Sequence, residues 1–184
     1  MPAAVMAFAA FIRAIGPETH AVMPLPKLRA ACEKLGLRDV KSYIASGNLY
    51  FRSSLQAAEC SRILSAAISK FGLKLEAFTR SGVALDRIIA ENPFLEAARQ
   101  RPAQLAAILF DDEFDEALVK ELLAWPGPEA LAVRPGVVYV DYVVGQGRSK
   151  INSPTIERRM KRVGTARNWN TILKMRALIG AMED

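Results

Sequence analysis

The stretch Tyr43-Ile44-Ala45-Ser46-Gly47-Asn48-Leu49-Tyr50-Phe51 decides how this chain folds, because it predicts a β-hairpin. Gly47-Asn48 is one of the dipeptides that accept the positive φ angles of a tight two-residue turn. A turn at this position pairs Ser46 with Leu49 and Ile44 with Phe51. The hairpin therefore predicts an antiparallel sheet.

The two faces of this hairpin differ in character. Because side chains alternate across a strand, the expected pairing puts Ile44, Leu49 and Phe51 on one face. The other face receives Tyr43, Tyr50 and Arg52. We expect the first face to be core.

The segments around the hairpin follow the same order of elements twice. The first half predicts a buried strand over 7–12, a loop over 17–20, helices over 25–35 and 57–71, a strand over 73–78 and a helix over 85–91. The second half predicts a strand over 104–110, a helix over 114–123, a hairpin over 131–142 that turns at Pro135-Gly136, and a basic helix over 155–163. A last helix is expected over 169–182.

Strand, helix, hairpin and helix in this order close readily as an antiparallel sheet with helices on one face, which is the ferredoxin-like arrangement. We therefore expect an α+β fold of two intimately packed ferredoxin-like subdomains. The expected boundaries are 1–80 for the first subdomain, 81–101 for a connecting helix, 102–163 for the second subdomain, and 164–184 for a C-terminal helix segment that carries the polar stretch 165–171.

Apolar stripes on these elements predict part of the core. The residues expected there are Ile44, Phe51, Ile63, Phe71, Leu109, Leu122 and Val140. Cys32 and Cys60 lie on helical stripes and are expected to be buried, reduced thiols. No segment approaches 18 uninterrupted apolar residues, so we expect a cytoplasmic protein with no membrane partner.

The net charge of +6 is unevenly spread along the sequence. Residues 1–144 contain 16 Lys and Arg against 16 Asp and Glu, whereas residues 145–184 contain 9 against 3. A basic C-terminal region favours an anionic partner such as a phosphate group or nucleic acid.

Familiar catalytic patterns are mostly absent. His20 is the only histidine, and the acidic run Asp111-Asp112-Glu113 is explained by the preference of carboxylates for a helix start. The sequence contains no nucleophile elbow, Walker loop or Rossmann fingerprint. We therefore expect no metal site and no cofactor.

Two polar stretches precede predicted helices. Gly145-Gln146-Gly147-Arg148-Ser149-Lys150 offers flexible glycines, a hydroxyl and two cations, which suit an anion. Thr165-Ala166-Arg167-Asn168-Trp169-Asn170-Thr171 repeats this mixture. In the alternative interpretation, Asn168 or Thr165 caps the last helix and Trp169 anchors it in the core.

Three segments resemble the bacterial family called domain of unknown function 1697. They are Phe11-Ile12-Arg13, the hairpin 43–51, and Ser149-Lys150 followed by 165–171. The resemblance implies two ferredoxin-like subdomains and, by the family's name, no established activity. The hairpin residues Ser46 and Asn48 keep the family pattern and join the candidate binding residues on that ground.

The chain departs from the family in its first loop. Members typically follow the arginine with Gly-Ile-Asn-Val-Gly-Gly, whereas this sequence has Ala14-Ile15-Gly16-Pro17 after Arg13. The asparagine and the paired glycines are therefore lost, and binding through that loop is not implied here.

These observations favour a module that binds an anionic, phosphorylated ligand or nucleic acid through its basic C-terminal region. The ligand-binding residues expected are Arg13, Ser46, Asn48, Gly147, Ser149, Lys150, Arg167, Asn168 and Asn170. Five of them, Arg13, Ser149, Lys150, Arg167 and Asn170, are expected to converge on one pocket between the subdomains.

Two other functions stay open. One is an enzyme for a small phosphorylated or carboxylated substrate, with Ser149 or Asn168 near the reacting group, although the sequence shows no obvious base. The other is an interaction or structural protein with no small-molecule site. Tyr43 and Tyr50, together on the non-core face of a strand pair, are compatible with single-stranded RNA as the ligand of the binding module.

Overall fold

The protein is described by a computed structural model that covers residues 4–183. The chain forms two compact units, the first made of residues up to Asp86 together with those from Lys174 onward, and the second of residues 87–173. Each unit contains one antiparallel four-stranded sheet in the described residues. The boundaries between the units fall within α4 (Gly82–Ala90) and α8 (Trp169–Glu183).

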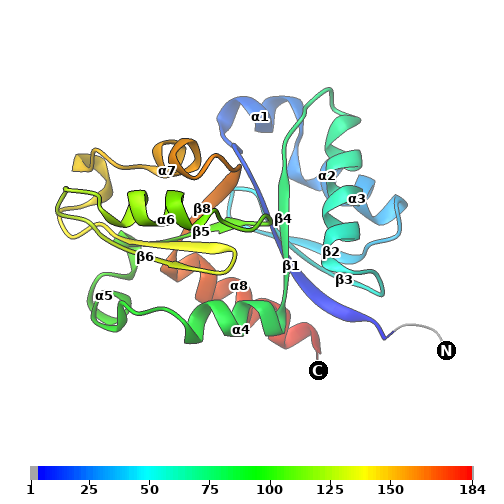
Figure 1. Ribbon diagram of the computed structural model, residues 1–184. Helices are drawn as coiled ribbons and strands as arrows, with labels where there is room; N and C mark the ends of the chain where they lie inside the picture. The colour runs from blue at the N-terminus through cyan, green and yellow to red at the C-terminus, as the bar shows by residue number, and fades with distance from the viewer. Residues whose placement is uncertain (1–3, 184) are drawn as a thin grey trace. The chain divides into compact units, whose positions relative to one another are not determined.

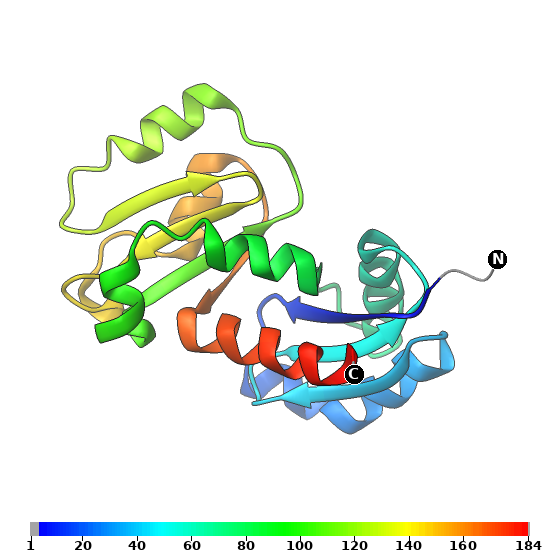
Figure 2. The same cartoon turned by 90° about the horizontal axis from the view of Figure 1, so that it is seen from below.

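Unit 1 has the strand order β2-β3-β1-β4. In chain order, the elements of unit 1 that precede α4 are β1 (Met6–Ile12), α1 (Pro17–Val22), α2 (Leu25–Lys34), β2 (Arg38–Tyr43), β3 (Asn48–Ser53), α3 (Ala57–Ser69) and β4 (Ala77–Ser81). Figure 1 shows α2 and α3 on one side of this sheet, and in Figure 2 they lie behind the strands, whereas the C-terminal part of α8 passes in front of them.

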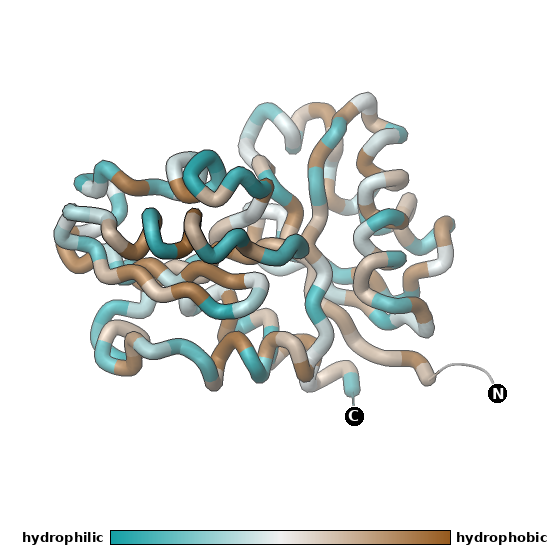
Figure 3. Tube along the Cα trace, viewed as in Figure 1, coloured by the Kyte–Doolittle hydropathy of each residue, from teal (hydrophilic) through white to brown (hydrophobic). Residues whose placement is uncertain are grey.

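The core of unit 1 lies between the sheet and α2 and α3. Phe8, Ala10 and Ile12 of β1 and Leu49 and Phe51 of β3 are fully buried there, because alternate residues of both strands point to the helix-covered face. The helices contribute their own apolar stripes, visible in Figure 3 as alternating brown and teal positions.

Unit 2 repeats this topology with the strand order β6-β7-β5-β8. Its elements after α4 are α5 (Leu95–Gln100), η1 (Pro102–Gln104), β5 (Leu105–Phe110), α6 (Glu116–Leu123), β6 (Ala130–Arg134), β7 (Val137–Asp141), η2 (Gln146–Arg148), α7 (Ser153–Met160) and β8 (Gly164–Asn168). Figure 1 shows α6 and α7 on the same face of the sheet. The predicted α+β fold with the ferredoxin-like arrangement used twice is confirmed.

The predicted register of the first hairpin is wrong by four residues, because Leu49 pairs with Ser42 and not with Ser46. The observed pairs are Tyr43 with Asn48 and Lys41 with Tyr50, so four residues form the connection in place of two. Ile44 therefore leaves the strand, with a φ of 49° and a side chain that is 53% exposed, and its assignment to the core is wrong. Tyr43 and Tyr50 nevertheless share one face, as expected.

The longer connection follows from a close contact that the local pattern did not reveal. Gly47 has a φ of 79°, and a Cβ there would lie 2.5 Å from Cγ1 of Ile15. The backbone N–H of Ile12 donates a hydrogen bond to the carbonyl of Gly47. The loop is thus held by the end of β1, and Gly47 is required both for its positive φ and for space.

Several other local predictions need correction. Residues 17–22 form α1 because Thr19 and Gly16 exchange hydrogen bonds at its start. The strand expected over 73–78 is shifted to β4. The polar stretch 165–171 was expected as a loop before the last helix, but its residues 165–168 belong to strand β8, which pairs with β5 and completes the second sheet. Its polar residues hid this strand because β8 is an edge of the sheet.

The remaining core predictions have different outcomes. Phe51, Leu109, Leu122 and Val140 are fully buried, and Ile63 and Phe71 are partly buried against the unit 1 core. Cys32 and Cys60 are both buried and unpaired.

Candidate functional site

Two of the three candidate residues of unit 1, Ser46 and Asn48, hold the hairpin loop together. The Asn48 amide donates to the carbonyl of Tyr43 at 3.2 Å and to the hydroxyl of Ser46 at 2.9 Å, and Asn48 is fully buried. Arg13 follows β1, and its backbone N–H donates to the carbonyl of Glu76. Ser46 and Asn48 are therefore close together, and their visible role is to close the loop.

Asn168 begins the last helix, as the capping interpretation predicted. Its side-chain oxygen accepts hydrogen bonds from the backbone N–H of Thr171 at 3.0 Å and from the Thr171 hydroxyl at 3.1 Å. Trp169 is 3% exposed, and its ring lies 6.3 Å from the Tyr139 ring. Asn170 is exposed in the first turn of α8.

Arg167 lies on β8 and donates to the Thr165 hydroxyl and the Ala166 carbonyl. Burial lowers its pKa to about 10. The nearby strand residue Asp141 pairs with Arg101 through two hydrogen bonds of 3.1 and 2.5 Å.

A pocket of about 300 Å³ lies at the loop that joins α6 to β6 and the loop that follows β7. Its lining residues are Trp125, Pro126, Gly127, Pro128, Glu129, Arg148 and Lys150. Of the nine predicted ligand-binding residues, Lys150 lines this pocket, Ser149 is bonded to its wall, and Gly147 lies in the adjoining η2.

Glu129 connects the two loops that form the pocket. Its Oε1 accepts a hydrogen bond of 2.5 Å from the Ser149 hydroxyl, and its Oε2 accepts one of 2.7 Å from the Trp125 indole nitrogen. The Ser149 oxygen also accepts from the backbone N–H of Ile151. Glu129 is only 7% exposed, so both carboxylate oxygens are satisfied within the protein.

The protonation of Glu129 reflects this arrangement. Burial by itself raises the pKa of Glu129, but the hydrogen bonds from Ser149, from Trp125 and from the backbone of Glu129 itself lower the pKa overall. The carboxylate is therefore ionised at neutral pH.

Arg148 and Lys150 are the two cations of the pocket. Both are exposed, and neither side chain forms an ion pair or hydrogen bond with any residue in the described range. Other arginines of the unit do have acidic partners: Arg101 pairs with Asp141, and Arg159 lies 3.8 Å from Glu121. Arg159 also lies 5.2 Å from the Trp125 ring centroid, in cation–π contact.

This geometry offers two unpaired positive charges beside an apolar wall of tryptophan and proline. Such a site can hold an anionic group with an apolar part attached. Within the described part of the chain, no three His, Cys, Asp or Glu side chains are grouped so that they could hold a metal ion. No helix formed by residues 4–183 is long and apolar enough to cross a membrane.

The pocket was only partly accessible to sequence reasoning. In the sequence, the segment Trp125-Pro126-Gly127-Pro128-Glu129 predicts only a connection between a helix and a hairpin. A tryptophan and a carboxylate that flank Pro-Gly-Pro were the available signal. The expected meeting of Arg13 with Ser149, Lys150, Arg167 and Asn170 stays a prediction, because Arg13 belongs to unit 1 and the others to unit 2.

Comparison with known proteins places the chain in a family without an assigned activity. None of the curated proteins matches it. Among solved structures it is similar to the conserved bacterial protein SP0830 from Streptococcus pneumoniae, with a TM-score of 0.73 at 18% sequence identity over 96% of this chain and 99% of that one. At this identity the likeness concerns the fold. The family model described as protein of unknown function (DUF1697) matches residues 6–139, and the chain therefore belongs to the DUF1697 family.

Proposed function

We propose that unit 2 binds a small phosphate-containing molecule in the pocket beside Trp125. The single observation that carries the proposal is the pair Arg148 and Lys150, two exposed cations on one pocket without an acidic partner among the described residues. Two cations separated by one residue can contact different oxygens of one phosphate group.

The pocket wall also carries the negative charge of Glu129, whose two oxygens accept hydrogen bonds from Ser149 and Trp125. Arg148 and Lys150 outnumber this carboxylate, so the lining keeps a net positive charge. Glu129 positions the two loops, while Arg148 and Lys150 remain available for the anion.

The rest of the lining supports a ligand with an apolar or ring-shaped part. Trp125, Pro126 and Pro128 contribute apolar surface. A pocket of about 300 Å³ is at the small end of the usual range for small-molecule sites. A sugar phosphate or a mononucleotide matches this combination of size, charge and surface.

The test compares phosphorylated and unphosphorylated forms of the same compound. AMP against adenosine, and ribose 5-phosphate against ribose, are titrated while the thermal midpoint is followed. A ligand at 100 times its dissociation constant adds about 2.7 kcal/mol, which raises the midpoint of a protein of this size by roughly 5–10 °C. We expect a rise with a phosphorylated compound and none with its partner.

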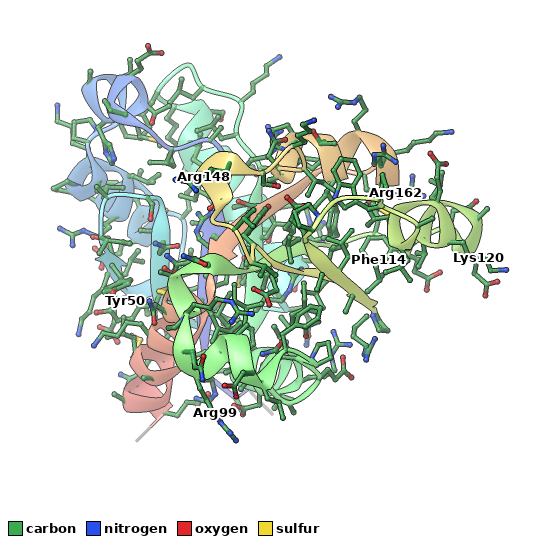
Figure 4. All side chains as sticks on the ribbon, turned by 90° about the vertical axis from the view of Figure 1, so that its left-hand side faces the viewer. Tyr50, Arg99, Phe114, Lys120, Arg148 and Arg162 are labelled. Atoms are coloured by element: carbon green, nitrogen blue, oxygen red, sulfur yellow. The ribbon has the colours of Figure 1, made fainter. Side chains whose placement is uncertain are left out.

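Variants connect the effect to the pocket. Lys150→Ala and Arg148→Ala are each expected to weaken binding by about 10- to 150-fold, the range for a hydrogen bond to a charged group. Lys120→Ala is the matched control, because Lys120 is an exposed cation of the same unit that lies well apart from Arg148 in Figure 4. Unchanged binding by both Arg148→Ala and Lys150→Ala, or no effect of any phosphorylated compound, contradicts the proposal and favours an interaction protein without a small-molecule site.

The enzyme alternative has one observation in its favour, the hydrogen bond from the Ser149 hydroxyl to Glu129. The same serine oxygen is also bonded to the backbone of Ile151, and the lowered pKa of Glu129 makes this carboxylate a weak base. Binding therefore fits the geometry better than nucleophilic catalysis.

A further inference from the structure

The face of the unit 1 sheet that points away from α2 and α3 carries two tyrosines and three cations on β2 and β3. Paired residues of antiparallel strands share a face, and the pairs here are Tyr43 with Asn48, Lys41 with Tyr50, and Arg38 with Arg52. Residues 48, 50 and 52 alternate with the core residues Leu49 and Phe51. Tyr43, Tyr50, Lys41, Arg38 and Arg52 therefore lie together on the face opposite α2 and α3, and we call this set the tyrosine face. The C-terminal part of α8 covers the neighbouring part of the same face, where Ala9 and Phe11 of β1 are fully buried (Figure 2).

The aromatic side chains of the tyrosine face are partly exposed. Tyr43 and Tyr50 are both half-buried, and neither hydroxyl forms a hydrogen bond with any described residue. Tyr43 lies diagonally across from Tyr50 in the strand pair, a position that separates side chains by about 7–8 Å. Two rings at this spacing can each receive one base of a flexible strand.

The cations of the tyrosine face are largely uncompensated. Arg38 and Lys41 are exposed, and their side chains form no ion pair with any residue that the structure describes. Arg52 is engaged, since it pairs with Asp39 at 3.2 Å and donates to the Met182 carbonyl at 2.9 Å. Arg38 and Lys41 are therefore the charges available to a partner.

The positive charge of the protein is concentrated in unit 1, which carries the tyrosine face. Unit 1 contains 13 Lys and Arg against 8 Asp and Glu, whereas unit 2 contains 12 against 11. The excess that appears C-terminal along the sequence is thus balanced within unit 2 by acidic residues such as those at 111–116. Most of the net positive charge belongs to the unit that carries the tyrosine face.

A pocket continues the tyrosine face at its Arg38–Arg52 end. It has a volume of about 650 Å³, and its lining includes the cations Arg38 and Arg52. The carboxylates of Asp39 and of Glu183 in α8 line the same pocket. From Tyr43 to Arg38 the strand spans roughly 15–17 Å before the pocket begins. This path is longer than a mononucleotide and suits an extended chain of several nucleotides.

We propose that the tyrosine face binds single-stranded nucleic acid, with bases stacked on Tyr43 and Tyr50 and phosphates bound by Lys41 and Arg38. Aromatic rings accept any base because every base has a π-face, so the binding tolerates different sequences. Duplexes bind poorly, because their bases are already stacked and cannot reach the rings. This function is separate from the pocket of unit 2 and does not depend on it.

The experiment measures fluorescence anisotropy of labelled twelve-residue oligo(U) and oligo(dT), with a twelve-base-pair DNA duplex as comparison. We expect a dissociation constant of about 10⁻⁶–10⁻⁴ M for single strands, weakened by salt. Tyr43→Ala and Tyr50→Ala each weaken binding by about 5- to 150-fold, while Tyr43→Phe and Tyr50→Phe keep it. Lys41→Ala reduces the slope of the logarithm of the binding constant against the logarithm of the salt concentration by about 0.7.

The comparison of RNA with DNA has two outcomes that support the proposal. Tighter binding of oligo(U) than of oligo(dT) indicates contact with the 2′-hydroxyl, and equal binding indicates recognition through stacking and phosphate contacts alone.

The control is Arg62→Ala, which removes the same charge from α3 on the opposite face of the sheet. Thermal midpoints of all variants are measured, and the phenylalanine variants report on stacking even if an alanine variant unfolds. The proposal is overturned if the duplex binds as well as the single strands, or if the alanine and phenylalanine variants bind alike. Loss of binding in Arg148→Ala and Lys150→Ala but not in Lys41→Ala would also overturn it and assign nucleic acid to unit 2.

Discussion

The indole Nε1 of Trp125 donates a 2.7 Å hydrogen bond to Oε2 of Glu129, four residues further along the chain. The Pro-Gly-Pro segment between them wraps around this bond. A Cβ on Gly127 would overlap both the indole nitrogen and the carboxylate oxygen. The wall of the unit 2 pocket therefore depends on a glycine at this position.

Gly127→Ala is expected to destabilise the protein by about 1–3 kcal/mol, because the added methyl group has to displace Trp125 or Glu129. Urea unfolding followed by circular dichroism measures the loss. Gly147→Ala is the matched control, since no atom lies within 4 Å of a Cβ at Gly147. Equal stability of the Gly127→Ala variant and the wild type would falsify the close approach.

The stability contributed by Glu129 depends on pH. Its pKa in the folded state is lowered from the usual 4.5, so it stabilises the fold above about pH 4.5, and this stabilisation is lost as the pH falls through the folded-state pKa. We expect the wild type to be more stable than Glu129→Gln at pH 7 and the difference to shrink below pH 4.5. Urea titrations of both proteins between pH 3 and pH 7 measure this, and a difference that grows on acidification contradicts the prediction.

Phe51→Ala is expected to cost about 3–5 kcal/mol, because Phe51 is fully buried and its ring stacks on Phe8 with centroids 6.0 Å apart. Ile44→Ala in the same hairpin is expected to change stability by less than about 0.5 kcal/mol, because Ile44 is exposed. Chemical denaturation of both variants tests the observed register. The two effects would be reversed or equal if the hairpin faces were assigned wrongly.

Both cysteines are expected to resist alkylation in the folded protein. Burial raises the pKa of Cys32 to about 12 and also raises that of Cys60, so neither forms the reactive thiolate near neutral pH. Iodoacetamide at pH 8 should leave the native protein unmodified by intact mass and should label both thiols after unfolding without reductant. Labelling of neither thiol in the unfolded chain would indicate a disulfide, and rapid labelling of the native chain would show that the thiols are accessible.

Much of the architecture was readable from the sequence. The apolar runs at β1 and β5, the helical stripes of α2, α3 and α6, and the Pro135-Gly136 turn between β6 and β7 each combine a local pattern with burial of one face. In such segments local propensity and the demand for a core agree, so element order and the α+β fold follow from periodicity. The cap at Asn168 was predicted for the same reason, since capping involves residues three positions apart.

Other features were decided by residues distant in the sequence. Isoleucine favours strands, yet Ile44 lies in the loop and is exposed. The close approach of Gly47 to Ile15 and the hydrogen bond from the Ile12 N–H to Gly47 determine the conformation of this loop. The polar segment that forms β8 becomes a strand because β5 provides an edge for it to pair with.

The sites show the same division. Sequence alone determined that Ser149 and Lys150 stand in a basic, glycine-rich loop and that Tyr43 and Tyr50 share a strand face. Only the tertiary structure brought Trp125 and Glu129 to that loop, which lies some 20 residues away, and showed which cations have acidic partners. The physical reason is that a sequence pattern reports periodicity within one element, whereas hydrogen bonds and ion pairs between loops depend on how the sheet brings distant strand ends together.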